Sequence, residues 1–207
     1  MSRFCYNNFR IIIKDGEKSI MERSDLKRFI DPKILIGERV ILRKITQKDL
    51  SDVYEYASNP RVPEFLLWNP HPSLGFTKKY LSIVDKKYKR GEFYDYAVEY
   101  QGKMIGTCGF TSFSLENNSA EIGFVLNPGY WGRGIATEAA KLVIKYGFEV
   151  LSLNRIEARF MAENHQSRRV MEKCNMTFEG IMRQSMLVKG KYRNIGICSI
   201  LREEYFK

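Results

Sequence analysis

One stretch of the chain changes its hydrophobic period abruptly. Apolar side chains occupy every second position of residues 120–126, which predicts a strand with one apolar face. From residue 135 to about residue 150, apolar side chains recur at helical spacing with polar residues between them, which predicts an amphipathic helix. The loop of residues 127–134 therefore joins the end of a strand to the start of a helix.

The same two patterns, alternation and helical spacing, predict the elements of most of the remaining chain after residue 38. Strands are predicted at residues 39–44, 94–99, 104–113, 155–161, 177–188 and 192–201, and helices at residues 47–57, 77–89 and 164–174. Thr46 is a suitable N-cap for the first of these helices. Gly102 and the pair Lys189-Gly190 mark two hairpin turns.

Three glycines, Gly129, Gly132 and Gly134, lie in the loop before the central helix. Glycine adopts backbone conformations that a side chain forbids, and it lets a ligand approach the amides. The first N–H groups of a helix lack intrahelical acceptors, and the helix dipole favours an anion beside them. The loop predicts a phosphate site, although the same spacing is also typical of a tight turn without a ligand. It matches neither a Rossmann fingerprint nor a Walker loop.

Gly123 interrupts the predicted strand before this loop. A glycine inside a strand indicates a β-bulge or a close approach of another part of the chain. Strand, irregularity, loop and helix together predict a cleft with backbone donors at its floor.

Length and composition favour one folded domain. The chain has 207 residues, of which 44% are hydrophobic and 13% aromatic. No apolar run reaches membrane-spanning length, and the three consecutive isoleucines at residues 11–13 are too few for a signal peptide, so we expect a cytoplasmic protein without membrane association. The four cysteines show no paired spacing, which predicts free thiols, and with two histidines a metal site is not expected.

The net charge of +10 is spread along the chain and forms no polybasic tail. Such a balance suits an anionic cofactor, an acidic substrate surface or nucleic acid, and it is also typical of a solvated basic surface. No nucleic-acid-binding motif is present, so we expect no direct nucleic-acid binding.

The loop of residues 129–134, Gly-Tyr-Trp-Gly-Arg-Gly, resembles the phosphate loop of the GNAT superfamily of N-acetyltransferases, which reads Gln/Arg-x-x-Gly-x-Gly/Ala before a helix. Both family glycines match, whereas Gly129 stands where the family has Gln or Arg. Residues 130–139 are similar to the Tyr-Trp-Gly-x-Gly-x-Ala-Thr-Glu-Ala run of the ribosomal-protein N-terminal acetyltransferase branch. The likeness covers residues 35–207 and leaves residues 1–34 as an N-terminal extension.

The resemblance implies a single α/β domain of the GNAT type over residues 35–207. Its sheet would be mixed and mostly antiparallel, splayed at a bulged central strand and flanked by helices. It also implies acetyl-CoA as co-substrate, no metal, and the possibility of a homodimer. The loop amides would hold the pyrophosphate, and the strand would pair with the pantetheine, with the Val125 N–H as a candidate for stabilising the oxyanion. The implied cofactor contacts are Phe124, Val125, Leu126, Gly132, Arg133, Gly134, Ile135, Ala136, Thr137 and Asn164.

Acetyl transfer to an amine needs a base for the ammonium and a proton for the leaving thiolate. Glu121 is the candidate base, because it lies on the non-core face of the strand at a position that often carries this role in the family; the alternative is a solvated glutamate. Asn164 is a good N-cap, and Ser167, one turn later on the same helix face, is the candidate acid. The tyrosine that many family members have is replaced by Met171, and a second glutamate of some ribosomal-protein acetyltransferases by Met186.

The apolar, proline-rich segment of residues 62–73 corresponds to a family segment that contributes to the acceptor site. Phe65 and Trp68 are therefore candidate substrate contacts, with simple core packing as the alternative. A protein or peptide N-terminus is the expected acceptor. A small amine, such as a polyamine or an antibiotic, and a non-catalytic acyl-CoA-binding module are the alternatives.

The family's Leu-Gly-Phe at the end of the helix predicted at residues 164–174 is replaced by Cys174-Asn175-Met176. Asparagine tolerates the left-handed conformation that a helix end requires. We therefore expect the helix end to survive this substitution.

Overall fold

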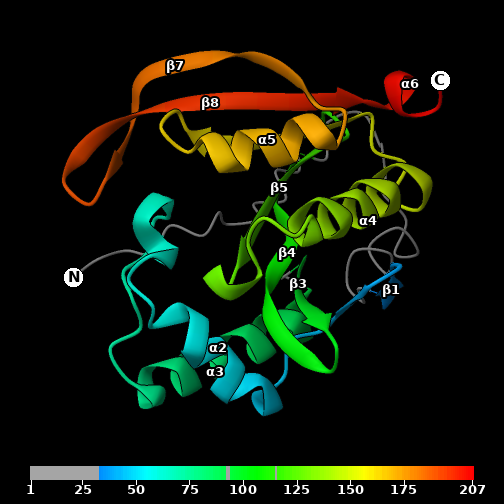
Figure 1. Cartoon of the computed structure of the whole chain (residues 1–207). Coiled ribbons are helices and arrows are strands. Elements are labelled where there is room, and N and C mark those ends of the chain that lie inside the picture. The colour runs from blue at the N-terminus through cyan, green and yellow to red at the C-terminus, as the bar shows by residue number, and fades with distance from the viewer. Residues whose placement is uncertain (1–32, 92–93, 115) are drawn as a thin grey trace, which may run out of the picture.

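The computed structural model describes residues 33–91, 94–114 and 116–207. Within these residues a single eight-stranded sheet runs through the molecule in the order β1-β2-β3-β4-β5-β6-β8-β7. Figure 1 shows β4 and β5 in the middle of the molecule and the long strands β7 and β8 along its top. The strands are β1 (Leu35–Ile36), β2 (Val40–Arg43), β3 (Tyr94–Tyr100), β4 (Lys103–Ser114), β5 (Ser119–Leu126), β6 (Arg155–Met161), β7 (Thr177–Val188) and β8 (Lys191–Leu201).

Every neighbouring pair of strands is antiparallel except β5 and β6, which are parallel. The parallel pair follows from its connection, because the chain leaves β5 through a helix and returns beside it in the same direction. The mixed, mostly antiparallel α/β fold predicted from the sequence is therefore confirmed. Most of the predicted N-terminal extension, residues 1–32, lies outside the described residues.

Helices lie on both sides of the sheet. They are α2 (Leu50–Ala57), α3 (Leu74–Arg90), α4 (Ile135–Glu149), α5 (His165–Lys173) and the short α6 (Arg202–Tyr205), with 3-10 turns η1 (Gln47–Asp49), η2 (Val62–Phe65) and η3 (Pro128–Tyr130). Thr46 caps η1 as predicted, in a capping box with Asp49. Helix α3 begins earlier than predicted because the Ser73 hydroxyl caps it by accepting from the Phe76 N–H.

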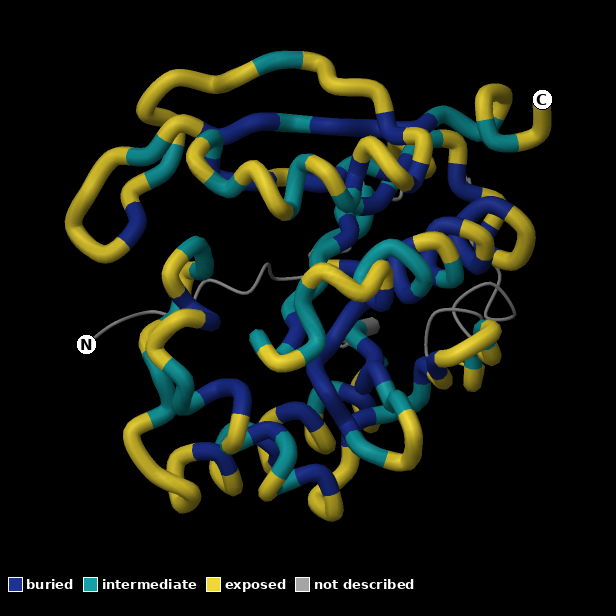
Figure 2. Tube along the Cα trace, viewed as in Figure 1, coloured by how far each residue is buried: buried dark blue, intermediate teal, exposed yellow. Residues whose placement is uncertain are grey.

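The two helix layers can be assigned from the alternation along β3. Tyr96 and Val98 belong to the core cluster that contains α4, whereas Ala97 belongs to the cluster that contains α2 and α3. Because successive side chains of a strand point to opposite faces, α4 covers one face of the sheet, and α2 and α3 cover the other. Figure 2 shows the buried inner side of α4 and the exposure of the edge strand β7. No helix among the described residues is long and apolar enough to cross a membrane.

The sheet opens between β5 and β6. Their pairing ends at Ile122 and Ala158, and both strands continue beyond that point without pairing to each other. The bulge itself is not in β5. The register of the β4–β5 ladder shifts at Thr111 in β4, and Gly123 is the close approach, since a Cβ there would lie 2.8 Å from the Thr111 Cγ2. The predicted splay is thus present, with the bulge in the neighbouring strand.

Turns and helix ends follow the local sequence. Lys189 and Gly190 both have positive φ, as a two-residue hairpin turn requires, and the turn at Gln101 and Gly102 is of the same kind. Asn175 ends α5 with a φ of 60°, so the left-handed conformation expected of this asparagine is confirmed.

Candidate active site

The glycine loop carries the conformation that its sequence predicts. Gly132 has a φ of 77° and Gly134 a φ of 76°, a region that disfavours other L-residues. Gly134 is the N-cap of α4 and supplies no side-chain oxygen, so the first amides of α4 are left without a side-chain acceptor from the cap. A Cβ at Gly132 would have no described protein atom within 4 Å. The loop therefore presents open backbone donors, which fit the pyrophosphate of a nucleotide cofactor.

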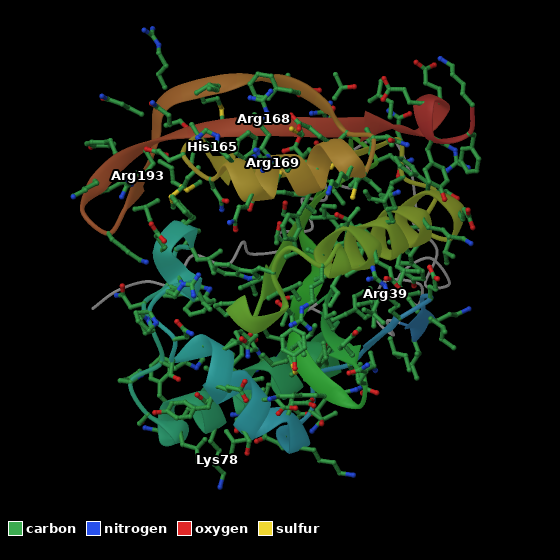
Figure 3. The ribbon with its side chains drawn as sticks, in the orientation of Figure 1. Arg39, Lys78, His165, Arg168, Arg169 and Arg193 are labelled. Atoms are coloured by element: carbon green, nitrogen blue, oxygen red, sulfur yellow. The ribbon has the colours of Figure 1, made fainter. Side chains whose placement is uncertain are left out.

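Arg39, which the sequence analysis missed, braces this loop from the turn between β1 and β2. Its guanidinium donates to the Arg133 carbonyl at 3.0 Å and, through Nε, to a Glu138 carboxylate oxygen at 2.7 Å. Burial opposes ionisation of Glu138, but the hydrogen bonds from Arg39 outweigh it and lower the pKa of this carboxyl. Figure 3 shows Arg39 on the β1 side of the molecule. No local pattern signals this contact, because its partners are about 100 residues apart in sequence.

The register of β5 decides which of its backbone groups face the opening. Val125 pairs with Thr107 of β4, and the Asn127 N–H donates to the Ile105 carbonyl of β4. Since backbone groups alternate sides along a strand, the N–H of Val125 also points to β4. The backbone N–H and carbonyl groups of Phe124 and Leu126 point away from β4, into the splay. The Trp131 indole accordingly donates to the Leu126 carbonyl at 2.8 Å, leaving the two N–H groups for a ligand.

Glu121 lies where the splay begins, on the face of the sheet opposite α4. Glu121 is the register partner of Glu157 on β6. The Arg159 Nε lies 3.5 Å from the Glu121 carboxylate. Arg159 also bonds Glu157 at 3.0 Å. Burial raises the pKa of Glu121, Arg159 opposes the rise, and the charge of Glu157 adds to it. Glu121 is therefore a half-buried carboxylate in a charged network and not a freely solvated strand residue.

The start of α5 brings Asn164 and Ser167 together. The Asn164 side-chain oxygen accepts from the Ser167 N–H at 3.1 Å, which confirms the predicted N-cap. The Ser167 side chain is partly exposed, and no hydrogen bond to its hydroxyl is found among the described residues. Met171 is buried in the core that α4 and α5 share, so this position serves packing.

Phe65 and Trp68 are separated by the fold. Phe65 packs against Met161, Val188 and Ile195 at the far end of β6, β7 and β8. Trp68 packs against the core of α2 and α3 instead. Phe65 lies beside the end of β6, and Trp68 shares its cluster with Val125 of β5, so each is next to one of the two strands that line the splay.

The described residues contain no group of three or more histidine, cysteine and acidic side chains that would hold a metal ion. Cys108, Cys174 and Cys198 are buried free thiols, as expected, whereas Cys5 lies outside the described residues.

A hollow of about 410 Å³ lies on the outer flank of α4, lined by residues such as Lys141, Asn175 and Tyr205. None of the predicted site residues lines this hollow.

Known proteins resemble the chain over most of its length. An uncharacterized N-acetyltransferase, p20, of Bacillus licheniformis is 32% identical, covering 83% of this chain and 97% of that protein. A spermidine N(1)-acetyltransferase of Escherichia coli is 28% identical, covering 80% of this chain and 88% of that enzyme.

Solved structures share the fold. An acetyltransferase of the GNAT family from Bacillus anthracis superposes with a TM-score of 0.74 at 31% identity, covering 83% of this chain and all of the other. RimL, a ribosomal alpha-N-protein acetyltransferase in complex with coenzyme A, superposes with a TM-score of 0.71 at 21% identity, covering 82% of this chain and 98% of that one.

The family follows from these likenesses and from the site. The open strand β5, the left-handed glycine loop and the exposed amides of α4 together fit a coenzyme A thioester. Residues 39–177 match the family model described as the acetyltransferase (GNAT) domain. The chain therefore belongs to the GNAT family of acetyltransferases.

Proposed function

We propose that this protein transfers the acetyl group of acetyl-CoA to the N-terminal amine of a protein or peptide. The observation that carries the proposal is the splay of β5 from β6 immediately before the glycine loop. It leaves the N–H groups of Phe124 and Leu126 open on one side and Glu121 at its closed end. Acetyl transfer itself is the activity of the family to which the chain belongs.

The donor is held by backbone groups in this proposal. The amides of residues 132–137 bind the pyrophosphate, and Arg39 keeps the loop in position through the Arg133 carbonyl. The pantetheine runs back along β5 and pairs with Leu126 and Phe124 as an added strand would. The Phe124 N–H, which is nearer to Glu121, stabilises the oxyanion. We choose this amide over that of Val125, because the Val125 N–H points to β4.

The acid and base are side chains of this chain. Glu121 accepts a proton from the acceptor ammonium, directly or through one water, and the neutral amine attacks the thioester carbon. The N–C bond forms, the attacking nitrogen releases its extra proton to water, and the C–S bond breaks as the tetrahedral intermediate collapses to the neutral amide. The Ser167 hydroxyl donates to the leaving thiolate and regains its proton from water. Met171 cannot take this part, since it is buried and has no proton to donate.

Acetylation of a small amine is the second candidate. The observation in its favour is the likeness to spermidine N(1)-acetyltransferase. Such an acceptor carries several positive charges and needs carboxylates around its entrance. The two candidates therefore differ in the charge of the acceptor, which an amine panel measures directly.

The test is thiol release from acetyl-CoA with N-terminal peptides and small amines, on wild type, Glu121→Gln and Ser167→Ala. Loss of a positioned acid or base lowers kcat by roughly 10²- to 10⁴-fold. Both variants should retain acetyl-CoA affinity, because the loop amides are untouched. Glu172→Gln is the matched control, since Glu172 is an exposed residue of α5 whose carboxylate pairs, within the described part of the chain, with Arg168. Tight acetyl-CoA binding without turnover of any amine would instead indicate a non-catalytic acyl-CoA-binding module.

A further inference from the structure

The open end of the splay is bordered by side chains that the acetyl-transfer scheme does not use. Ile156 and Ala158 of β6 belong to the core under α4, so Glu121, Arg159 and Met161 share the opposite face. Ile195 pairs with Met161 and packs with it against Phe65. Arg193, two residues before Ile195 on β8, points to this same face.

Arg193 is only partly satisfied there. Its Nε is buried and has no hydrogen-bond partner among the described residues. Its terminal nitrogen lies 3.6 Å from a Glu163 oxygen, a loose contact to a side chain that is half exposed. Figure 3 shows Arg193 beside the β7–β8 hairpin, at the same end of the sheet as His165. A buried donor without an acceptor is costly, and an incoming carboxylate would remove that cost.

Lys189 adds a second cation at the same place. Its ammonium donates to the Pro63 carbonyl of η2, which joins the hairpin to the segment that carries Phe65. Burial and the positive charge of Arg193 both lower the pKa of Lys189, because two nearby cations disfavour each other's charged form. Among the described residues, the acidic side chain in contact with Arg193 is that of Glu163. The local field attracts an anion and opposes a polycation.

Strand register sets the distance from this pair to the proposed base. Glu121 is level with Glu157, which is level with Ser199 of β8. Arg193 lies six residues before Ser199, which is about 20 Å along the strand at roughly 3.3 Å per residue, and β8 lies two strand spacings, about 10 Å, from β5, so the two Cα atoms are about 22 Å apart. The two long side chains span about half of that distance. An amine at Glu121 and a carboxylate at Arg193 must therefore be separated by about three residues of extended peptide, too far for a free amino acid.

We propose that Arg193, assisted by Lys189, binds an acidic side chain at the third or fourth position of the acceptor peptide. This inference rests on the proposed N-terminal acetylation. It adds the class of acceptor, an acidic N-terminus, and makes Arg193 a residue that determines specificity.

The experiment compares three peptides that begin with Ser-Ala and carry Asp, Ala or Lys at both the third and fourth positions. Binding to the full chain with coenzyme A is measured by fluorescence anisotropy, and kcat/KM by thiol release. We expect the Asp peptide to exceed the Ala peptide by about 10-fold or more, with the Lys peptide weakest. In Arg193→Gln the ratio of Asp to Ala peptide should fall to near one, and Arg193→Lys should restore part of it.

Arg183→Gln is the matched control, because Arg183 is an exposed arginine of the same hairpin and should leave the ratio unchanged. Equal binding of the three peptides, a preference for spermidine, or an Asp preference that survives in Arg193→Gln overturns the inference. Free aspartate as an efficient acceptor would also overturn it, since it cannot span the distance. If the Asp peptide binds with the expected preference but no amine is acetylated, the proposed function fails and the recognition site stands.

Discussion

Gly132 offers a direct test of the proposed cofactor site in the glycine loop. Its φ of 77° would cost an alanine about 1–2 kcal/mol, because the left-handed region crowds the Cβ against the following carbonyl. The added methyl meets no described protein atom within 4 Å, so no packing contact adds to this cost. The expected penalty in Gly132→Ala is therefore conformational.

This penalty must appear in one of two measurements. If the loop keeps its conformation without ligand, the free energy of unfolding falls by about 1–2 kcal/mol, and Tm falls by about 2–8 °C for a chain of this size. If the exposed loop relaxes, the strain returns when the amides must re-form the phosphate site, and acetyl-CoA affinity falls by about 5- to 30-fold. We expect mainly the second outcome, because nothing packs on Gly132 to hold a strained loop in place.

The assay is calorimetric titration with acetyl-CoA beside thermal unfolding. Gly129→Ala is the control: Gly129 is in the same loop but outside the left-handed region, and a Cβ there lies an ordinary 3.6 Å from the Asn127 side chain. Gly132→Asn should lose less than Gly132→Ala, because asparagine tolerates positive φ. The reasoning is refuted if Gly132→Ala changes neither affinity nor Tm, or if Gly129→Ala loses as much.

Three further predictions concern the base, the core and the helix cap. Arg159→Met should move the acid limb of kcat/KM to higher pH, because Arg159 opposes the raised pKa of Glu121 and a base is active only above its pKa; an unmoved limb would separate Glu121 from catalysis. Gly147→Ala should destabilise the fold by about 1–3 kcal/mol in urea unfolding, since its Cβ would lie 2.6 Å from the Ile156 side chain; unchanged stability would show that the core yields there. Asn164→Ala should lower the free energy of unfolding by about 1 kcal/mol, because the N-cap of α5 is lost, whereas Asn164→Asp should keep most of that stability. Equal losses in urea unfolding of the two variants would argue against capping as the cause.

Local sequence determined most of the secondary structure. Strand β6 and the long strand β7 have the predicted bounds, and α4 begins at the residue where the helical period begins. Short-range chemistry also fixed the left-handed glycines of the loop, the Asn164 cap and the hairpin turn at Lys189. These features depend on residues within a few positions of one another, which is the range over which a hydrophobic period or a cap acts. The short elements β1 and α6 escaped prediction because they have too few residues to show a period.

Tertiary structure alone decided what surrounds the site. The contact of Arg39 with Glu138, the ion pair of Glu121 with Arg159 and the bond of Lys189 to the Pro63 carbonyl of η2 all join residues that are far apart in the sequence. Register, which depends on the whole ladder, turned the open amide from Val125 to Phe124 and moved the bulge from Gly123 to β4. Sequence by itself therefore determined the left-handed conformation of the glycine loop. Long-range packing determined which charged side chains lie together at the splay, because those charges meet only after the sheet has formed.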